Sequence, residues 1–343
     1  MPFWSRIFSP QPTHDPSSFG FAVAGLGHGA EKFLAAVASS TQIRVTALVS
    51  RDPRKAEKLA RKYGIPTTCT YANFDTLRHN PHVQAVYIAI PNLLHRSFTE
   101  RAAAAGKHVL CEKPLASTIA EAQAMIDACS QAGVLLMTAY RCSFDPMHER
   151  AAQILASGRL GQINSITSDF GFRAKPGWRL DPTLAGGGSL HDVGIYAVHT
   201  LHDLFPGAFT IQSAQIKRDP TTGLELETTW QATLPNGAQA TCRSSYLTKL
   251  PDSFRIEGST GTLTLEPAYS YADTRLVATY ANQKQEILTA PRTPSPFRLE
   301  AEHLAHCALT GAPLRTPGQA GQRDLETIAA IEHAARKTLS HAT

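Results

Sequence analysis

The sequence predicts an α/β protein of two domains, the first of them built on a parallel Rossmann-type sheet. Three observations lead to this fold class. The chain has 343 residues, which is more than one ordinary hydrophobic core holds and fits two domains of roughly 150 residues each. In its first half, short apolar runs alternate with amphipathic segments, as in strands joined by right-handed helical crossovers. A glycine-rich turn, GLGHGA at 25–30, separates the first apolar run from the first amphipathic segment.

The elements of the first half follow in order along the chain. Strands are predicted over residues 19–24, 43–50, 85–90 and 108–112, and helices directly after the glycine-rich turn, over 52–64 and over 95–106. The first helix follows from the helical spacing of Phe33, Leu34 and Val37. The second has Pro53 in its first turn and Gly64 at its end, residue types that commonly begin and end helices.

The glycine-rich turn is a candidate dinucleotide-binding site. Gly25, Gly27 and Ala30 occupy the positions of the G-x-G-x-x-G/A pattern between a predicted strand and a predicted helix. In this pattern the first glycine makes the turn, the second lets the backbone approach a pyrophosphate, and the helix N-terminus offers free N–H groups. The candidate cofactor-binding residues of the turn are Gly25, Leu26, Gly27, His28 and Gly29.

The end of the second predicted strand indicates NADP rather than NAD. An NAD-binding unit usually has a carboxylate there to bind the ribose hydroxyls. This strand ends in Ser50 and is followed by Arg51, with Lys55 on the next helix. A hydroxyl and two cations would hold a 2′-phosphate through charge-assisted hydrogen bonds. One alternative stays open, namely that both cations are solvated surface charges, and the neighbouring Asp52 keeps it open.

The composition is that of a globular protein with no membrane or nucleic-acid partner. Hydrophobic residues make up 43% and charged residues 18% of the chain. The 33 basic against 28 acidic residues give a net charge of +5 without a long basic run, which argues against a nucleic-acid partner. No run approaches the roughly 20 apolar residues of a membrane span.

The cysteines and the first residues predict a cytoplasmic protein. The six cysteines are widely spaced with no C-x-x-C pair, as expected for reduced, mostly buried thiols. Residues 1–18 lack the apolar core of a signal peptide and are predicted to be a flexible arm.

Several specific motifs occur together along the chain. They are Pro91-Asn92 with His95, Glu112-Lys113-Pro114, YRCSFDP from residue 140, WRL from residue 178 and GGGSLHDVGIY from residue 186. In combination they resemble the glucose–fructose oxidoreductase, inositol dehydrogenase and rhizopine-catabolism (Gfo/Idh/MocA) family. Within the family they are most similar to glucose–fructose oxidoreductase itself, and the resemblance spans nearly everything after the arm.

The resemblance implies a second domain with a large, mostly antiparallel open sheet. We therefore expect an NADP-binding Rossmann domain over 19–140 and an α+β domain for substrate binding and oligomerisation over 141–343. The later sequence agrees, because strand-like runs over 223–235, 237–248, 253–260 and 261–269 are separated by turn residues. In the family the open sheet face commonly packs on a second subunit, since an uncovered apolar face would be adhesive. We expect a homodimer or homotetramer.

The same resemblance implies a catalytic group of Lys113, Asp192 and Tyr196. Asp192 and Tyr196 are four residues apart, so in a helix they share one face. Tyr196 is the expected acid/base. A free phenol is a poor base near neutral pH, and the Lys113 ammonium would favour its anion and stabilise a developing alkoxide. Asp192 would orient the sugar and balance the lysine charge.

Further residues are implied at the cofactor and the substrate. The additional candidate cofactor-binding residues are Pro91, Asn92, His95, Glu112, Lys113, Arg141, Trp178 and Arg179. The candidate substrate-binding residues are Lys113, Arg179, Asp192 and Tyr196.

Several of these assignments have structural alternatives. Trp178 and Arg179 could equally be a packed tryptophan and a solvated arginine, and Arg141 could serve in structural ion pairing. A metal site is not expected, because His191 and His199 are eight helical residues apart, about 12 Å by rise, and no H-E-x-x-H or thiolate pattern occurs.

The expected function is oxidation of the anomeric carbon of an aldose to a lactone, with a hydride passed to NADP. If NADP is held tightly, a second sugar would reoxidise it. Two alternatives stay open: a dehydrogenase of sugars or dihydrodiols with dissociable cofactor, and a sensor that binds dinucleotide without turnover. The segment 169–178 is shorter than and different from that of glucose–fructose oxidoreductase, so the substrate is not determined.

Overall fold

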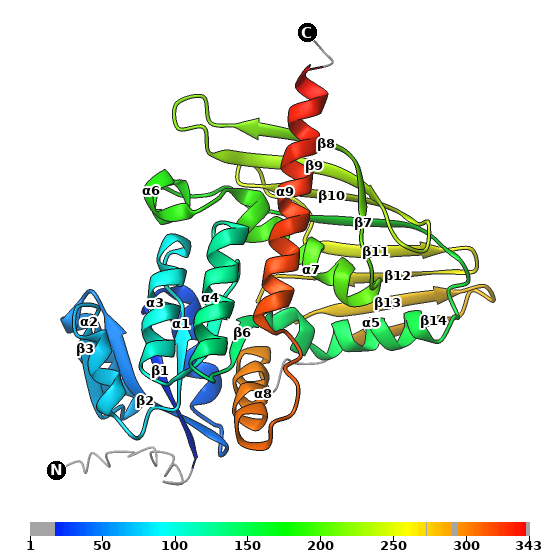
Figure 1. The fold of residues 1–343 in the computed structure, drawn as a ribbon. Coiled ribbons are helices and arrows are strands. Elements are labelled where there is room, and N and C mark those ends of the chain that lie inside the picture. The colour runs from blue at the N-terminus through cyan, green and yellow to red at the C-terminus, as the bar shows by residue number, and fades with distance from the viewer. Residues whose placement is uncertain (1–17, 272, 290–293, 341–343) are drawn as a thin grey trace, which may run out of the picture.

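The computed structural model describes residues 18–271, 273–289 and 294–340, and its strands form two sheets. Figure 1 shows the six-stranded sheet with its helices beside the larger, eight-stranded sheet. The predicted fold class is confirmed. The arm predicted over 1–18 lies outside the described residues except for Ser18.

The first sheet is a parallel Rossmann sheet with the order β3-β2-β1-β4-β5-β6. Its strands are β1 (Phe19–Ala24), β2 (Ile43–Ser50), β3 (Thr67–Thr70), β4 (Ala85–Ile88), β5 (His108–Glu112) and β6 (Leu136–Ala139). The connecting helices are α1 (His28–Val37), α2 (Pro53–Tyr63), η1 (Phe74–His79), η2 (Asn92–Leu94), α3 (His95–Ala104) and α4 (Ile119–Gln131). The predicted strands and helices of this half are confirmed, with bounds that differ by a few residues at some ends.

Local sequence explains the bounds of α2. Asp52 precedes the helix, and its side chain accepts hydrogen bonds from the backbone N–H groups of Arg54 and Lys55. Pro53 occupies the first turn, where a missing N–H has no consequence. The helix ends at Gly64, which has φ 67° in the left-handed region that favours glycine.

The second sheet has the order β14-β13-β12-β11-β7-β10-β9-β8. All of its neighbouring strands are antiparallel except β7 and β10, which are parallel. Its strands are β7 (Ile163–Gly171), β8 (Thr210–Arg218), β9 (Glu225–Thr233), β10 (Gln239–Ser245), β11 (Ser253–Gly258), β12 (Gly261–Glu266), β13 (Arg275–Tyr280) and β14 (Gln285–Thr289).

Helices lie across one face of the second sheet (Figure 1). The helices of this half are η3 (Arg141–Phe144), α5 (Pro146–Ala156), η4 (Trp178–Leu180), α6 (Pro182–Ala185), the π-helix η5 (Leu190–Gly194), α7 (Ile195–Leu204), α8 (Pro296–Thr310) and α9 (Gly318–Ser340). Helix α9 contacts β8 as well as α4 and β6 of the Rossmann domain. It therefore joins the two sheets.

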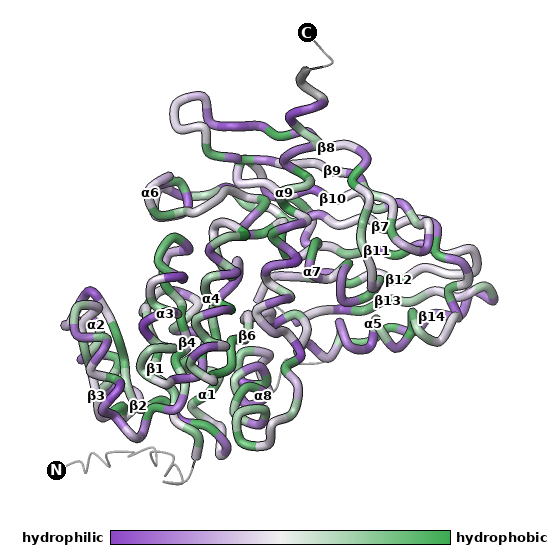
Figure 2. The backbone as a smooth tube through the Cα atoms, in the orientation of Figure 1, coloured by the Kyte–Doolittle hydropathy of each residue, from purple (hydrophilic) through white to green (hydrophobic). Residues whose placement is uncertain are grey.

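The side chains that alternate with the buried ones on the second sheet are mostly polar. One buried cross-strand row consists of Ile256, Ile166, Ala240 and Ala232. The neighbouring exposed row consists of Arg255, Thr167, Thr241 and Gln231. The strands accordingly change between hydrophobic and hydrophilic along their length (Figure 2). The expectation of an apolar open face is wrong, and a subunit interface there, which stays a prediction, would be polar.

Helix α8 belongs to the core of the Rossmann domain although it lies late in the chain. Phe297, Ala301 and Leu304 are buried in one hydrophobic cluster with Phe33 and Leu48. The proposed second domain over 141–343 thus contributes a helix to the first. Among the described helices, none combines the length and the apolar character needed to span a membrane.

Candidate active site

The candidate site lies where the strands of the Rossmann sheet end. Strands β1 and β4 are neighbours, but the chain leaves β1 toward β2 on its other side. In parallel α/β sheets this reversal of strand order opens a crevice beyond the carboxyl ends of the strands. The glycine-rich turn follows β1, Pro91 and Asn92 follow β4, and Lys113 follows β5. Residues far apart in the sequence therefore meet at one edge.

A cavity of about 400 Å³ occupies this crevice. It is lined by nearly all the predicted site residues, namely Gly25, Leu26, Gly27, His28, Gly29, Ser50, Arg51, Lys55, Pro91, Asn92, Glu112, Lys113, Arg141, Trp178, Arg179, Asp192 and Tyr196. The remaining lining residues are Asp52, Tyr71, Ala89, Ile90, Tyr271 and Phe297. Both halves of the chain thus contribute to a single cavity.

The glycine-rich turn has the shape that a dinucleotide requires. Gly25 has φ 89°, and a Cβ there would collide with the carbonyl oxygen of Ala89. A Cβ on Gly27 would meet no atom within 4 Å, so the missing side chain leaves open space above the backbone. The N-terminus of α1 has no side-chain cap, which leaves its amides free for a phosphate. The residues present fit a bound dinucleotide.

The residues after β2 have divided roles. Asp52 caps α2 through its carboxylate, and its backbone N–H donates to the Ser50 hydroxyl at 3.0 Å. Lys55 is paired with Glu31 at 2.8 Å, both side chains being partly exposed. Arg51 is exposed and lines the cavity. The carboxylate that could have bound a ribose hydroxyl is therefore already engaged with the helix.

The three consecutive glycines at 186–188 allow the second domain to approach the crevice. Gly186 and Gly187 have φ 60° and 144°. A Cβ on Gly188 would collide with the backbone carbonyl oxygen of Glu225. The buried Glu225 carboxylate accepts hydrogen bonds from the Ser189 hydroxyl and the Leu190 N–H, each at 2.7 Å. These contacts fix the start of η5, a π-helical turn of the kind frequent at functional sites.

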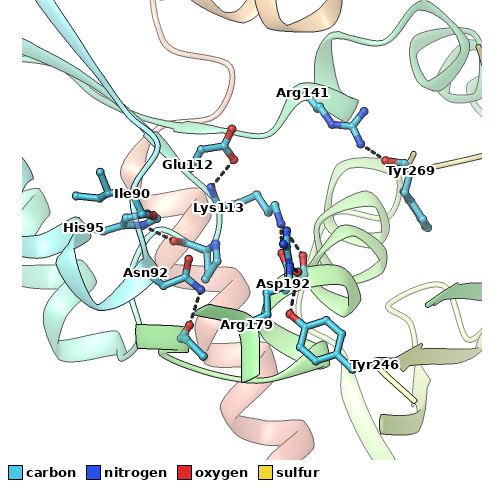
Figure 3. A network of polar contacts seen from close by, with 12 residues as sticks. Ile90, Asn92, His95, Glu112, Lys113, Arg141, Arg179, Asp192, Tyr246 and Tyr269 are labelled. Atoms are coloured by element: carbon cyan, nitrogen blue, oxygen red, sulfur yellow. Dashed lines mark hydrogen bonds and ion pairs between the residues drawn. The ribbon is translucent and has the colours of Figure 1, made fainter. Parts of the chain in front are cut away.

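Asp192 in η5 is the centre of the polar network. Lys113 Nζ donates to its Oδ1 at 2.7 Å and to its backbone oxygen at 2.6 Å. Arg179 Nε and the Tyr246 hydroxyl donate to its Oδ2 at 2.7 and 2.8 Å. Figure 3 shows Lys113, Arg179 and Tyr246 converging on this carboxylate. Asp192 is thus the shared partner of two cations and a phenol.

This network favours the charged forms of both Asp192 and Lys113. Burial alone would raise the pKa of Asp192, but the charges of Lys113 and Arg179 outweigh it and hold that pKa well below its usual value. Burial would lower the pKa of Lys113, but the Asp192 charge raises it above its ordinary value. Lys113 is therefore an ammonium over the whole working pH range, unable to act as a general base but suited to stabilise negative charge.

Tyr196, one helical turn after Asp192, also lines the cavity. Its ring stacks on Tyr269, with centroids 5.6 Å apart and planes at 18°. The Lys113 ammonium lies 4.8 Å and the Arg141 guanidinium 5.2 Å from its ring centroid. The phenol is therefore held by packing and flanked by two cations.

Arg141 and Arg179 each have partners within the protein. Arg141 is buried and donates to the Tyr269 carbonyl, so its fixed position is structural, and the residue also lines the cavity. Arg179 is not a solvated arginine, because it pairs with Asp192 and lies 4.6 Å from the ring of Trp178.

His95 is a correction to the predicted site. It is fully buried and does not line the cavity. Its Nδ1 lies 2.9 Å from the Pro114 carbonyl and its Nε2 lies 3.0 Å from the Ile90 carbonyl. His95 therefore joins the loops after β4 and β5 and supports Lys113 from behind. The buried ring, held between these two carbonyls, has no exposed surface for a cofactor.

Sequence reasoning missed four aromatic residues of the site. Tyr71, Tyr271 and Phe297 line the cavity, and Tyr246 binds Asp192. None belongs to a motif singled out from the sequence. Aromatic residues are common in cores, so no local signal marked these four.

Of the two histidines considered as metal ligands, His199 is engaged with other side chains. His199 Nδ1 lies 2.7 Å from Asp324, and its Nε2 lies 2.8 Å from the Ser143 hydroxyl and 3.4 Å from Asp203. His202 contacts Thr327. Within the described ranges, no group of three or more histidine, cysteine or acidic side chains is placed to hold a metal.

The setting of His199 predicts a loss of stability at alkaline pH. Burial would lower its pKa, but Asp324 and Asp203 raise it from 6.5 to about 9. A raised pKa in the folded state means that the stabilisation is complete below pH 6.5 and is lost as pH rises through about 9. We expect the difference in unfolding free energy between wild type and His199→Asn to shrink over this range in urea titrations. A difference that stays constant would show that the imidazole is neutral throughout.

A dinucleotide-binding turn that faces a buried lysine–aspartate pair and a tyrosine defines a Rossmann-fold oxidoreductase. A family model described as "Oxidoreductase family, NAD-binding Rossmann fold" matches residues 19–140, and the GFO/IDH/MocA C-terminal domain matches residues 148–264. The chain belongs to the Gfo/Idh/MocA oxidoreductase family. The predicted family and enzyme class are confirmed.

Individual relatives cover almost the whole chain. D-xylose 1-dehydrogenase (NADP(+)) 2 of Haloferax volcanii is 35% identical over 92% of this chain and 97% of its own length. Trans-1,2-dihydrobenzene-1,2-diol dehydrogenase of Mus musculus is 28% identical over 88% of this chain and 90% of its own. The crystal structure of aldose-aldose oxidoreductase from Caulobacter crescentus, complexed with glycerol, has a TM-score of 0.88 and 36% identity, covering 94% and 98% of the two chains.

Proposed function

We propose that this protein is an NADP-dependent sugar oxidoreductase that oxidises the anomeric carbon of an aldose to a lactone. The observation that carries the proposal is the meeting of Lys113, Asp192 and Tyr196 in the same cavity as the glycine-rich turn. The relatives named as a D-xylose 1-dehydrogenase and an aldose-aldose oxidoreductase support the substrate class.

The proposed chemistry divides between three side chains. Oxidation removes the C1 hydrogen as a hydride and the hydroxyl hydrogen as a proton; NADP, when bound, supplies the hydride acceptor. Tyr196, in its deprotonated phenolate form, accepts the proton at its phenolic oxygen and becomes the neutral phenol. The Lys113 ammonium stabilises the alkoxide that develops on the reacting oxygen.

Asp192 is proposed mainly as the group that keeps Lys113 in its ammonium form and directs it toward the reacting oxygen. Its two oxygens already accept from Lys113, Arg179 and Tyr246, so little capacity is left for a sugar hydroxyl. Arg179 and Trp178 form the proposed wall on the substrate side, where an aromatic face next to a guanidinium suits a polyhydroxylated ligand.

The proposal is tested by adding a panel of aldoses, ketoses and dihydrodiols to the purified protein with NADP and recording the absorbance of reduced nicotinamide. Reduction by aldoses together with lactone formation supports it. Reduction by dihydrodiols alone would favour the activity for which the Mus musculus relative is named. No change with any compound would overturn the proposal in favour of a dinucleotide sensor.

Retention of the cofactor is a separate part of the proposal. Fresh protein that keeps stoichiometric NADP through gel filtration would support a cycle in which a second sugar reoxidises bound NADPH. Protein that is empty and needs added NADP would support an ordinary dehydrogenase.

Arg51 is predicted to discriminate NADP from NAD. Arg51→Ala should weaken NADP binding by about tenfold or more, the value of a charge-assisted hydrogen bond, and leave NAD binding unchanged. Titration calorimetry with both nucleotides measures the ratio of the dissociation constants for NADP and NAD. Arg54→Ala is the matched control, because Arg54 carries the same charge on α2 but does not line the cavity. Equal effects of the two variants on NADP would contradict a specific phosphate contact.

A further inference from the structure

Tyr271 brings the second domain to the glycine-rich turn. It lies in the connection between β12 and β13 and lines the same cavity as Gly27 and Lys113. Its ring meets the ring of His28, the first residue of α1, edge-on with centroids 5.5 Å apart. A contact thus runs across the cavity from one domain to the other.

Three further side chains hold this ring in place. Phe297 of α8 stacks on it, with centroids 5.9 Å apart and planes at 26°. The Arg141 guanidinium lies 4.8 Å from its centroid and the Lys32 ammonium 5.9 Å. The tyrosine is nevertheless 47% exposed, and it lines the cavity. A ring with this placement forms part of the cavity's boundary.

We propose that Tyr271 is a cofactor-retention residue that slows the release of the dinucleotide. His28 begins the helix whose uncapped amides are the candidate phosphate site, and Tyr271 packs against this residue from the opposite domain. Exchange of a nucleotide held there requires the ring to leave His28, Phe297 and Arg141. This inference rests on the proposed NADP dependence and identifies the residue that sets how long the cofactor stays.

Tyr271 shares one neighbour with the catalytic group, since the Arg141 guanidinium lies close to the rings of both Tyr196 and Tyr271. Tyr271 makes no hydrogen bond to Lys113 or Asp192, whose partners are Arg179, Tyr246 and each other. Removing its ring should therefore change the residence time of the nucleotide more than the chemistry. Tyr271→Phe keeps every ring contact, and Tyr271→Leu keeps apolar bulk without the aromatic contacts.

The experiment loads each full-length variant with NADPH, displaces it with excess NADP, and follows the loss of protein-bound nicotinamide fluorescence. Tyr271→Ala and Tyr271→Leu are expected to release NADPH about tenfold faster than wild type, and Tyr271→Phe within about twofold. Tyr280→Ala is the control, because this tyrosine packs on Arg159 away from the cavity.

The outcomes separate this inference from the proposed function. If wild type binds NADPH and the alanine and leucine variants release it at the wild-type rate, the retention role is wrong while the proposed function stands. If wild type binds no dinucleotide, both are overturned. Equal acceleration by Tyr280→Ala would also overturn the retention role, since the effect would then be unrelated to the cavity.

Discussion

Replacing Tyr196 by phenylalanine is expected to lower kcat by about 10² to 10⁴ fold, the usual contribution of a positioned acid/base. The ring contacts with Tyr269 and Phe170 do not involve the hydroxyl, so the fold and the shape of the cavity should persist. NADP affinity should change little. Steady-state kinetics with an aldose, together with a nucleotide titration, measure the two effects separately.

Tyr246→Phe provides the matched comparison. It also removes one phenolic hydroxyl near the site, but that hydroxyl donates to Asp192 rather than facing the cavity. Because Lys113 and Arg179 still bind the carboxylate, kcat is expected to fall only on the order of tenfold. Similar losses in the two variants would contradict a direct proton-transfer role for Tyr196.

Replacing Lys113 by methionine is expected to have the second-largest effect. The variant loses the ammonium that would stabilise the alkoxide, which predicts a fall in kcat of about 10² to 10³ fold. It also leaves the buried Asp192 carboxylate with Arg179 and Tyr246 alone, so stability should fall, because removing one partner of a buried ion pair leaves charge poorly compensated. Kinetics and urea unfolding measure both.

A double variant separates these two consequences. Lys113→Met combined with Asp192→Asn removes the uncompensated charge, so stability should recover relative to Lys113→Met while kcat stays low. Recovery of activity in the double variant would show that Lys113 acts through folding and not through the reaction. Lys113→Arg keeps the charge but not the compact ammonium, and incomplete recovery is expected from it.

Much of the Rossmann half could be predicted because its signals are local. Hydrophobic runs, Pro53 and Gly64 define strands and helix ends within a few residues of themselves. The glycine pattern at 25–30 predicts a turn for the same reason. The turn has a positive φ at Gly25, and glycine adopts such a conformation without help from distant segments. The motif residues at the strand ends then share an edge because parallel strands all point one way.

The second domain depended on resemblance to the family more than on local pattern. Its strands β9 to β12 could be recognised from the alternation of residue types. The order of the strands could not, because β10 pairs with β7, a strand about 75 residues earlier in the sequence. The polar character of the exposed row could have been read from the residues, but not which face it would occupy.

What the sequence by itself determined is the set of chemical groups and the local turns that present them: the glycine-rich turn, Lys113 at a strand end, and the spacing of Asp192 and Tyr196. What only the tertiary structure decided is which groups are paired and which face the cavity. Tyr246 became a partner of Asp192, Tyr271 reached His28, and His95 turned into the interior. These outcomes depend on contacts between distant segments. Because packing around the two sheets fixes the geometry of such contacts, the residues next to each group in the sequence do not predict them.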